Sequence, residues 1–394
     1  MKLVHLSDLH LGFRQYQRQT QTGINQREAD VAAAFRQAVN KIIEIAPDVI
    51  VIGGDVFHTV RPSNPAILHA YSQFSRLVQM LPDADIVMVE GNHDHPRTAE
   101  TGHIIRLFSS LGITVVDTRE DRVKLRGGEI SILAVPALIR PQPRFDPDPA
   151  ARYNVLLIHD EVEGVIQRFG SLAERPGGDL TLDEIHPERW DYVALGHYHV
   201  YHQVAPNAYY SGSLEYTSTN VWGEVDEEIE KKVSGKGFIE WDLATGAHRF
   251  HSIELARRVV DLPQIQGAGM TAAQLSEAIC ATVDACEGGI DDRVVRLIVR
   301  DVPRHILRDL DHRKIREFKR RALHFLLDAR RPQPVRIEAS GAPGRRASLA
   351  DTVRAMLESR DVTPGIDRKS LVELGLHYLE EADRLAPAIS GDDA

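Results

Sequence analysis

The sequence has only two cysteines among its 394 residues, Cys280 and Cys286, and both fall on one predicted helix. So few thiols exclude a disulfide framework and favour a reducing, cytoplasmic setting. The sequence has no run of about 18 apolar residues, so we expect no membrane-spanning helix. The stretch before Asp8 contains too few apolar side chains for a signal peptide.

An excess of positive charge is also missing. The formal net charge is −10, which argues against strong autonomous binding to nucleic acid. Hydrophobic residues make up 43% of the chain, enough for a sizeable core, and the length suits two or three domains.

Five polar groups each follow a short β-branched, apolar run that is typical of a strand. These runs are residues 2–6, 49–52, 86–89, 155–158 and 192–195. Open α/β sheets bind ligands at the carboxyl ends of their strands, so one site can collect all five groups. The groups offer Asp8 and His10, Asp55, Asn92 and His93, His159, and His197 and His199.

These residue types suit a pair of divalent cations. Two cations about 3.5–4 Å apart can clamp a phosphate and lower the pKa of a bridging water. Carboxylate, amide and imidazole suit manganese, iron or zinc. Asp55 is expected to bridge the cations, because a carboxylate has two oxygens to share. One cation could be completed by Asp8, His10 and His199, and the other by Asn92, His159 and His197.

Each group alone has a simpler interpretation. An Asp-x-His motif is often a surface turn or helix cap, and GNHD is often a turn. A single histidine after a strand is more often structural, and a His-x-His pair can arise by chance among 18 histidines. Together, five groups in one structural position and one order favour the metal centre.

This order of motifs resembles the calcineurin-like metallophosphoesterase superfamily, whose signature is D-x-H, GD, GNHD/E, a histidine and GHxH. Within it, LSDLHLG, GDVFH, EGNHD and GHYH followed by YYSGSLEYTS are similar to SbcD-type DNA double-strand-break repair nucleases. The resemblance covers about residues 1–255. It implies an α/β sandwich of two β-sheets flanked by helices, a small α+β capping domain and a helical C-terminus.

The resemblance also assigns roles to residues. His93 would contact the scissile phosphate and help to protonate the leaving oxygen. Asp94 would orient His93, although a loop-stabilising acceptor is an equal alternative. His58 would help to place the DNA strand, unless it is only a loop or cap histidine. The implied metal ligands are Asp8, His10, Asp55, Asn92, His159, His197 and His199.

The implied activity is hydrolysis of DNA with two manganese ions, as an exonuclease that could also cut single strands as an endonuclease. The implied partners are DNA, an SbcC-type coiled-coil ABC ATPase and a second copy of the chain, contacted through a helix such as residues 65–81. A small-molecule phosphodiesterase or phosphatase is the main alternative, and a DNA-end-binding scaffold is another. The scaffold is disfavoured because no ligand position is substituted.

We expect a nuclease domain at residues 1–260, a capping or DNA-binding domain at 261–345 and C-terminal helices at 346–394. In the first, residues 28–46, 65–81 and 101–111 are predicted helices, and residues 209–216, 237–243 and 249–255 are predicted strands. The charged segment 223–236 is expected to be a solvated loop. The breaker-rich segment 261–269 is the expected boundary.

The capping segment is predicted as helix, strand, helix, strand, with strands at residues 294–299 and 335–338. Its second helix is expected to bury a stripe of Ile315, Phe318, Ala322 and Phe325. Residues 300–331 carry six more basic than acidic side chains. This surface is either a solvated helix face or a contact for DNA phosphates.

Two further helices are predicted to start near Ser348 and Ser370. The stripe on the second helix either docks on this chain or grips a partner helix. The resemblance favours the root of the ATPase coiled coil. The stripe consists of Leu371, Leu374, Tyr378, Ala382 and Leu385.

Overall fold

The computed structural model describes residues 1–96, 98, 102–139, 142–165, 180–233, 235–332, 349–359 and 367–385. Contacts divide the chain into two compact units, Met1–Pro332 and Gln333–Ala394. The domain division expected from the sequence, with boundaries near residues 260 and 345, stays a prediction.

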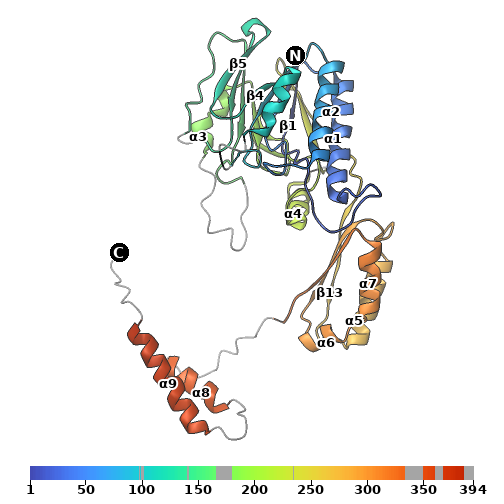
Figure 1. The fold of residues 1–394 in the computed structure, drawn as a ribbon, viewed down its shortest axis with the longest axis vertical. Helices are drawn as coiled ribbons and strands as arrows, with labels where there is room; N and C mark the ends of the chain where they lie inside the picture. The colour runs from blue at the N-terminus through green and yellow to red at the C-terminus, as the bar shows by residue number, and fades with distance from the viewer. Residues whose placement is uncertain are drawn as a thin grey trace. The chain divides into compact units, whose positions relative to one another are not determined.

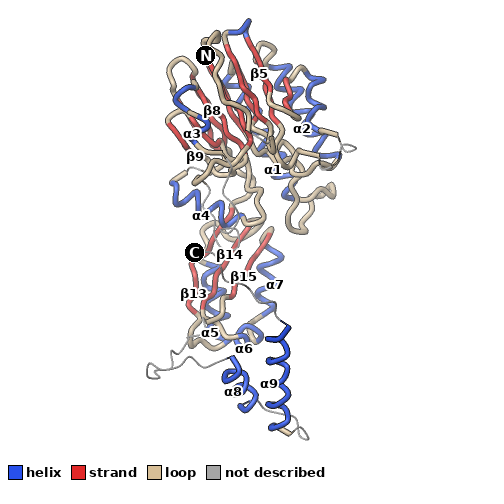
Figure 2. Tube along the Cα trace, turned by 90° about the vertical axis from the view of Figure 1, so that its left-hand side faces the viewer, coloured by secondary structure: helices blue, strands red, loops and turns tan. Residues whose placement is uncertain are grey.

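Two six-stranded sheets form the core of the first unit (Figure 2). In the first sheet, β1 to β4 run parallel and β11 pairs antiparallel with β1. The order of its strands is β12 (His248–Ser252), β11 (Gly237–Asp242), β1 (Lys2–Leu6), β2 (Val49–Ile52), β3 (Asp85–Val89) and β4 (Thr114–Val116).

The second sheet has a parallel centre of β6, β7, β8 and β10, with antiparallel strands at both edges. Its order is β5 (Asp121–Leu125), β6 (Ile130–Val135), β7 (Tyr153–His159), β8 (Tyr192–Gly196), β10 (Ala208–Tyr210) and β9 (His202–Ala205). The strand predicted at 209–216 is wrong beyond Tyr210, because the chain turns at Gly212, whose φ is +75°.

Alternate side chains of each strand point to opposite faces, which creates two cores. Leu3 and Val155 belong to the apolar layer between the two sheets. Val4 lies on the other face and belongs to a layer with Phe35 and Phe74. Those two residues come from helices α1 (Gln26–Ile45) and α2 (Asn64–Met80), which lie side by side along the first sheet (Figure 1). The predicted sandwich of two sheets flanked by helices is confirmed.

The flanking helices follow their predicted positions closely. The side chain of Ser63, two residues before the predicted start, caps α2 by accepting from the Ala66 amide. The predicted helix at 101–111 is a 3₁₀ helix, η1 (Ile104–Leu111), and Thr101 lies outside the described residues. Short helical turns complete the domain at η2 (Arg126–Gly128), α3 (Leu182–Ile185) and η4 (Pro187–Arg189).

The charged segment predicted as a loop contains helix α4 (Val221–Lys231). The prediction was wrong because two of its acids are not solvated. Glu224 and Glu228 are buried, and both lie against the buried ammonium of Lys236. The ammonium of Lys236 stabilises the charges of these two carboxylates, as water would do in an exposed loop.

A three-stranded parallel sheet builds the capping segment: β13 (Val259–Gln266), β14 (Val294–Arg300) and β15 (His324–Ala329). Its helices are α5 (Ala272–Asp284), α6 (Arg304–Arg308) and α7 (His312–Arg321). Phe325 therefore lies on a strand and not on the predicted helix, although it packs against Phe318. The strand predicted at 335–338 lies outside the described residues.

Two sequence expectations around this sheet need correction. Most of segment 261–269, expected as a boundary of breakers, continues strand β13, because its backbone pairs with β14 despite a shift in register. The helix expected to carry both cysteines ends at Asp284, so Cys280 lies on α5 and Cys286 lies beyond it.

The capping segment contacts the two-sheet sandwich through an apolar cluster and through hydrogen bonds from Arg18. Trp222 on α4 packs in one cluster with Val294 and Leu323. The guanidinium of Arg18 donates to the carbonyls of Arg320 at 2.8 Å and Ala322 at 3.1 Å, at the end of α7. A single arginine thus satisfies carbonyl groups that a helix leaves free at its C-terminus.

The second unit contains a helix pair, α8 (Leu349–Ser359) and α9 (Arg368–Leu385), which pack against each other. Val372 is buried, whereas Leu374 and Tyr378 of the predicted stripe are exposed. Leu374 and Tyr378 are therefore not covered by the rest of the described chain. The side chains of Ala382 and Leu385 lie outside the described ones.

Within the described ranges, we find no helix whose length and apolar character would let it cross a membrane.

Candidate metal centre

The backbone turns sharply where the predicted ligands follow their strands. Asp8, His10, Asp55 and His197 have positive φ angles of 53°, 45°, 50° and 108°. Residues other than glycine adopt such angles rarely, and each residue that does so costs on the order of 1–3 kcal/mol. Four of the seven predicted ligands are thus held in backbone conformations that the surrounding fold must enforce.

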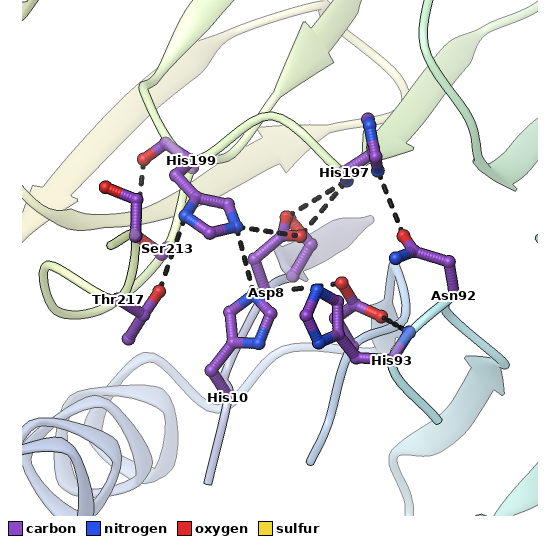
Figure 3. A network of polar contacts seen from close by, with 12 residues as sticks. Asp8, His10, Asn92, His93, His197, His199, Ser213 and Thr217 are labelled. Carbon is purple, nitrogen blue, oxygen red and sulfur yellow. Dashed lines mark hydrogen bonds and ion pairs between the residues drawn. The ribbon is translucent and has the colours of Figure 1, made fainter. Parts of the chain in front are cut away.

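The first predicted set of ligands converges as expected. Nε2 of His10 lies 2.9 Å from Nε2 of His199. His199 Nε2 also lies 4.0 Å from an oxygen of Asp8 (Figure 3). Ser7 donates to the second oxygen of Asp8 at 2.6 Å and fixes the carboxylate. Nitrogen and oxygen atoms that face one point in this way can hold a cation.

The second predicted set converges beside it. Oδ1 of Asn92 lies 3.0 Å from His197 Nδ1 (Figure 3). The same oxygen lies 3.0 Å from His159 Nε2. Nδ1–H of His159 donates to the Gly53 carbonyl at 2.6 Å, which leaves Nε2 of that ring free to face the site.

Asp55 lies between the two sets. Its Oδ2 is 3.7 Å from Nε2 of His10 and 3.6 Å from Nε2 of His159. Burial and then the charge of Asp8 raise the pKa of Asp55 to about 7. Two buried carboxylates without a cation repel each other, so a metal ion would relieve the cost of their ionisation. The donor set therefore fits a dinuclear metal centre with Asp55 as the shared ligand.

Two of the predicted ligand histidines favour the neutral form that metal ligands need. Burial lowers the pKa of His10 well below its ordinary value. Burial, followed by the neighbouring His159, lowers that of His197 to about 4. Such rings offer a lone pair and do not compete with a cation for the site.

Glycines next to the ligands allow the chain segments to approach closely. A Cβ added to Gly91 would overlap the backbone nitrogen and carboxylate of Asp55. A Cβ on Gly196 would overlap the carbonyl of Gly53 and lie 2.8 Å from Nδ1 of His159. Only glycine fits at these positions, so the centre requires the GD, GNHD and GHxH glycines for steric reasons.

His93 is held by two contacts outside its own loop. Its backbone N–H donates to Oδ1 of Asp55 at 2.8 Å, and its ring Nδ1–H donates to the His58 carbonyl at 2.8 Å. The ring also lies edge-on to His10, with centroids 4.8 Å apart. Because a carbonyl only accepts, Nδ1 carries a hydrogen, and Nε2 is the nitrogen available to a substrate.

Asp94 does not take the predicted role of orienting His93. Its two oxygens accept from the amides of Val56 at 3.0 Å, Phe57 at 2.8 Å and Gly91 at 3.2 Å. Burial and then Asp55 raise the pKa of Asp94 to about 8, against the lowering effect of the three amides. The geometry supports the alternative interpretation, in which Asp94 ties two loops together, while the His58 carbonyl orients His93.

His58 lies at the edge of the centre, as its motif predicts. Its ring stacks on His93 with centroids 5.1 Å apart, and its Nδ1 is 3.4 Å from Nδ1 of His10. Burial, then His93, lowers the pKa of His58 to about 4. The structure brings this residue to the site through both its ring and its backbone carbonyl.

The sequence interpretation missed Glu224 on α4. This buried carboxylate lies 3.6 Å from Nδ1 of His199, on the far side of the ring from Asp8, and forms a contact with Lys236. Burial alone would raise the pKa of Glu224, but Lys236 and His199 hold it below its ordinary value. Although burial opposes it, Glu224 also raises the pKa of His199. Carboxylates behind a ligand histidine fix its orientation and increase its basicity.

Comparison with known proteins agrees with this architecture. The family model described as "Calcineurin-like phosphoesterase" matches residues 1–201, about half of the chain. The chain belongs to this family and is a metal-dependent phosphoesterase. Enzymes of the family use a dinuclear metal centre, which fits the donor atoms collected around Asp55.

Its curated relatives include proteins named DNA double-strand break repair protein Mre11. The one from Methanococcus maripaludis is 27% identical over 258 residues, which cover 62% of this chain and 63% of that protein. The one from Methanocaldococcus jannaschii is 28% identical over 254 residues, again 62% and 63%. The one from Archaeoglobus fulgidus is 27% identical over 268 residues, which cover 61% of this chain and 56% of that protein. The chain therefore matches less than two thirds of the length of each.

Proposed function

We propose that this chain is a two-metal DNA nuclease of double-strand-break repair, active with manganese. It would act as an exonuclease on ends and as an endonuclease on single strands. The observation that carries the proposal is the meeting of both predicted ligand sets at Asp55, with His93 fixed beside them. The names of the archaeal relatives support DNA as the substrate.

The residues divide the chemistry between them. One cation would be held by Asp8, His10, Asp55 and His199, and the other by Asp55, Asn92, His159 and His197. The two bound cations would clamp a phosphate and lower the pKa of a water. His93 would give a proton from Nε2 to the leaving oxygen. The His58 carbonyl holds the other ring nitrogen, so the acid cannot turn away from the phosphate.

DNA is favoured over a small substrate by the capping segment. A cleft of about 710 Å³ lies where this segment meets the nuclease loop, and Arg18, Lys319 and Arg320 line it together with Tyr16. Exposed Arg313 continues the basic surface along α7. Cations arranged in this way bind phosphates in a series by releasing counterions.

Two protein partners belong to the proposal. The helix pair exposes Leu349, Met356, Leu374 and Tyr378, and we expect these side chains to grip the coiled-coil root of an SbcC-type ATPase. A second copy of the chain would pack on α2, whose Leu68 is 70% exposed. Both cysteines are free and half-buried, which suits a cytoplasmic setting.

The test is digestion of end-labelled linear DNA with manganese, comparing the wild type with His93→Ala. Metal content is measured in both proteins. We expect digestion by the wild type and little by a variant that still binds two ions. Digestion at the same rate by both proteins would remove His93 from the chemistry.

The same experiment separates the alternatives. If neither protein cuts DNA while the wild type cleaves an aryl phosphodiester, the chain is a small-molecule phosphodiesterase or needs its ATPase. Adding the ATPase with ATP then decides between these two. A wild type that cleaves neither substrate with two ions bound would support the scaffold.

A further inference from the structure

A second group of metal-binding side chains lies at the end of β3, outside the dinuclear centre. The carboxylate of Glu90 receives one histidine on each oxygen. His95 Nδ1 lies 2.9 Å from Oε2, and His103 Nδ1 lies 2.6 Å from Oε1. One donor atom of each of the three residues lies within 4.8 Å of the others. None of the three was singled out from the sequence.

Glu90 is the rigid member of the group. Its backbone N–H donates to the Val116 carbonyl at 2.9 Å, and its own carbonyl accepts from the Ala137 amide at 2.9 Å. Its side chain is fully buried. A buried carboxylate is costly unless positive charge or hydrogen bonds compensate it. Both of its oxygens face imidazoles, and the charge of Arg106 acts on it as well.

We propose that Glu90, His95 and His103 bind a third divalent cation of the zinc class. Zinc accepts imidazole nitrogen at about 2.0–2.1 Å and carboxylate oxygen at about 2.0–2.2 Å, usually in a tetrahedron. Three protein ligands leave a fourth position, and the ring of His95, 38% exposed, gives that position access to solvent. One carboxylate and two neutral rings match a dication better than a monovalent ion.

The role that follows is structural. His95 follows the GNHD loop, and His103 directly precedes η1. A cation shared with Glu90 would fasten both of these positions to the end of β3. Glu90 stands two residues before Asn92, so the same cation would stiffen the loop that carries Asn92 and His93. The site shares no side chain with the dinuclear centre, and its occupancy does not depend on the proposed nuclease activity.

The experiment counts zinc ions bound by the full chain, by calorimetric titration and elemental analysis. The wild type is expected to bind three ions, and the double variant His95→Ala/His103→Ala two. His251→Ala is the matched control, because His251 pairs with Glu240 at 2.7 Å on a sheet edge but has no third ligand recorded beside it in the described chain. It should bind three.

Further variants make the result independent of folding and of the main centre. Glu90→Gln keeps the size of the side chain and must also lose one ion, while circular dichroism confirms that it is folded. Asp55→Asn/His159→Ala, which disables the dinuclear centre, must still bind one ion that Glu90→Gln removes. The proposal is overturned if folded Glu90→Gln and the double variant bind as much zinc as the wild type, which would leave the group as a hydrogen-bonded tether only.

Discussion

The backbone N–H of His93 donates to one oxygen of Asp55, while the other oxygen of Asp55 faces His10 and His159. One carboxylate thus connects the proposed proton donor to both proposed cations. His93 also directly follows the proposed ligand Asn92, and its ring lies against that of His10. The position of His93 is consequently expected to depend on metal loading.

The substitution Asp55→Asn tests the place of this carboxylate as the shared ligand. The new side chain would keep an acceptor for the His93 amide but would lose the charge that two cations share. We expect at least one ion to be lost and turnover to fall more than about 100-fold, beyond the range seen for residues behind the ligands. Metal analysis with phosphodiesterase rates checks this, and a variant that binds as many ions as the wild type would contradict it.

The role of His93 as a proton donor predicts a dependence on the leaving group. His93→Ala should slow DNA cleavage by about 10²–10⁴-fold, the usual contribution of general acid catalysis. With a p-nitrophenyl phosphodiester, whose leaving oxygen needs little protonation, the loss should be much smaller. Equal losses on both substrates would assign His93 to substrate binding instead.

Asp94→Asn is expected to act on stability. The new amide nitrogen would face a backbone N–H, and a buried donor without its acceptor costs about 1–3 kcal/mol. Chemical denaturation of the metal-free protein measures this loss, with the ratio of DNA to p-nitrophenyl cleavage as a second readout. Unchanged stability together with the leaving-group pattern of His93→Ala would restore Asp94 as the residue that orients His93.

Glu224→Gln should weaken metal binding, although it replaces no predicted ligand. The variant removes the charge behind His199, and such changes typically cost about 10–100-fold in metal affinity. Manganese titration is the measurement. Glu230→Gln, an exposed change on the same helix, is the matched control and should leave the affinity unchanged.

Arg18→Ala separates the capping segment from the chemistry. Loss of the contacts to the carbonyls of Arg320 and Ala322 should loosen the docking of α7. We expect about 10-fold slower DNA cleavage, equivalent to about 1.4 kcal/mol, and an unchanged rate with the p-nitrophenyl substrate. An equal fall on both substrates would mean that Arg18 supports the metal centre itself.

The strands and the convergence of the predicted ligands could be predicted because local patterns encode them. Each ligand group follows a β-branched run, and parallel strands bring their ends to one edge. The glycines of the motifs, such as Gly91, mark where chain segments approach closely. These features can be predicted because they depend only on residues that are close together in the sequence.

The sequence-based predictions failed where residues far apart in the sequence determine the surroundings of a side chain. Glu224 looked solvated because its partners, Lys236 and His199, are not adjacent to it in the sequence. Asp94 looked like a partner of His93 because it is its neighbour, yet its hydrogen bonds run to the loop after Asp55. The positive φ values at Asp8 and His10 were not predicted, since glycine is the residue that usually marks such positions.

The proposed ligands are drawn from both sheets. Asp8, His10, Asp55 and Asn92 follow strands of the first, whereas His159, His197 and His199 follow strands of the second. Each cation would need at least one side chain from either half of the sandwich. Metal binding would therefore require the two sheets to be correctly assembled. A molecule whose sheets have slipped or separated could keep its local structure, but it could not hold the two cations and would be inactive.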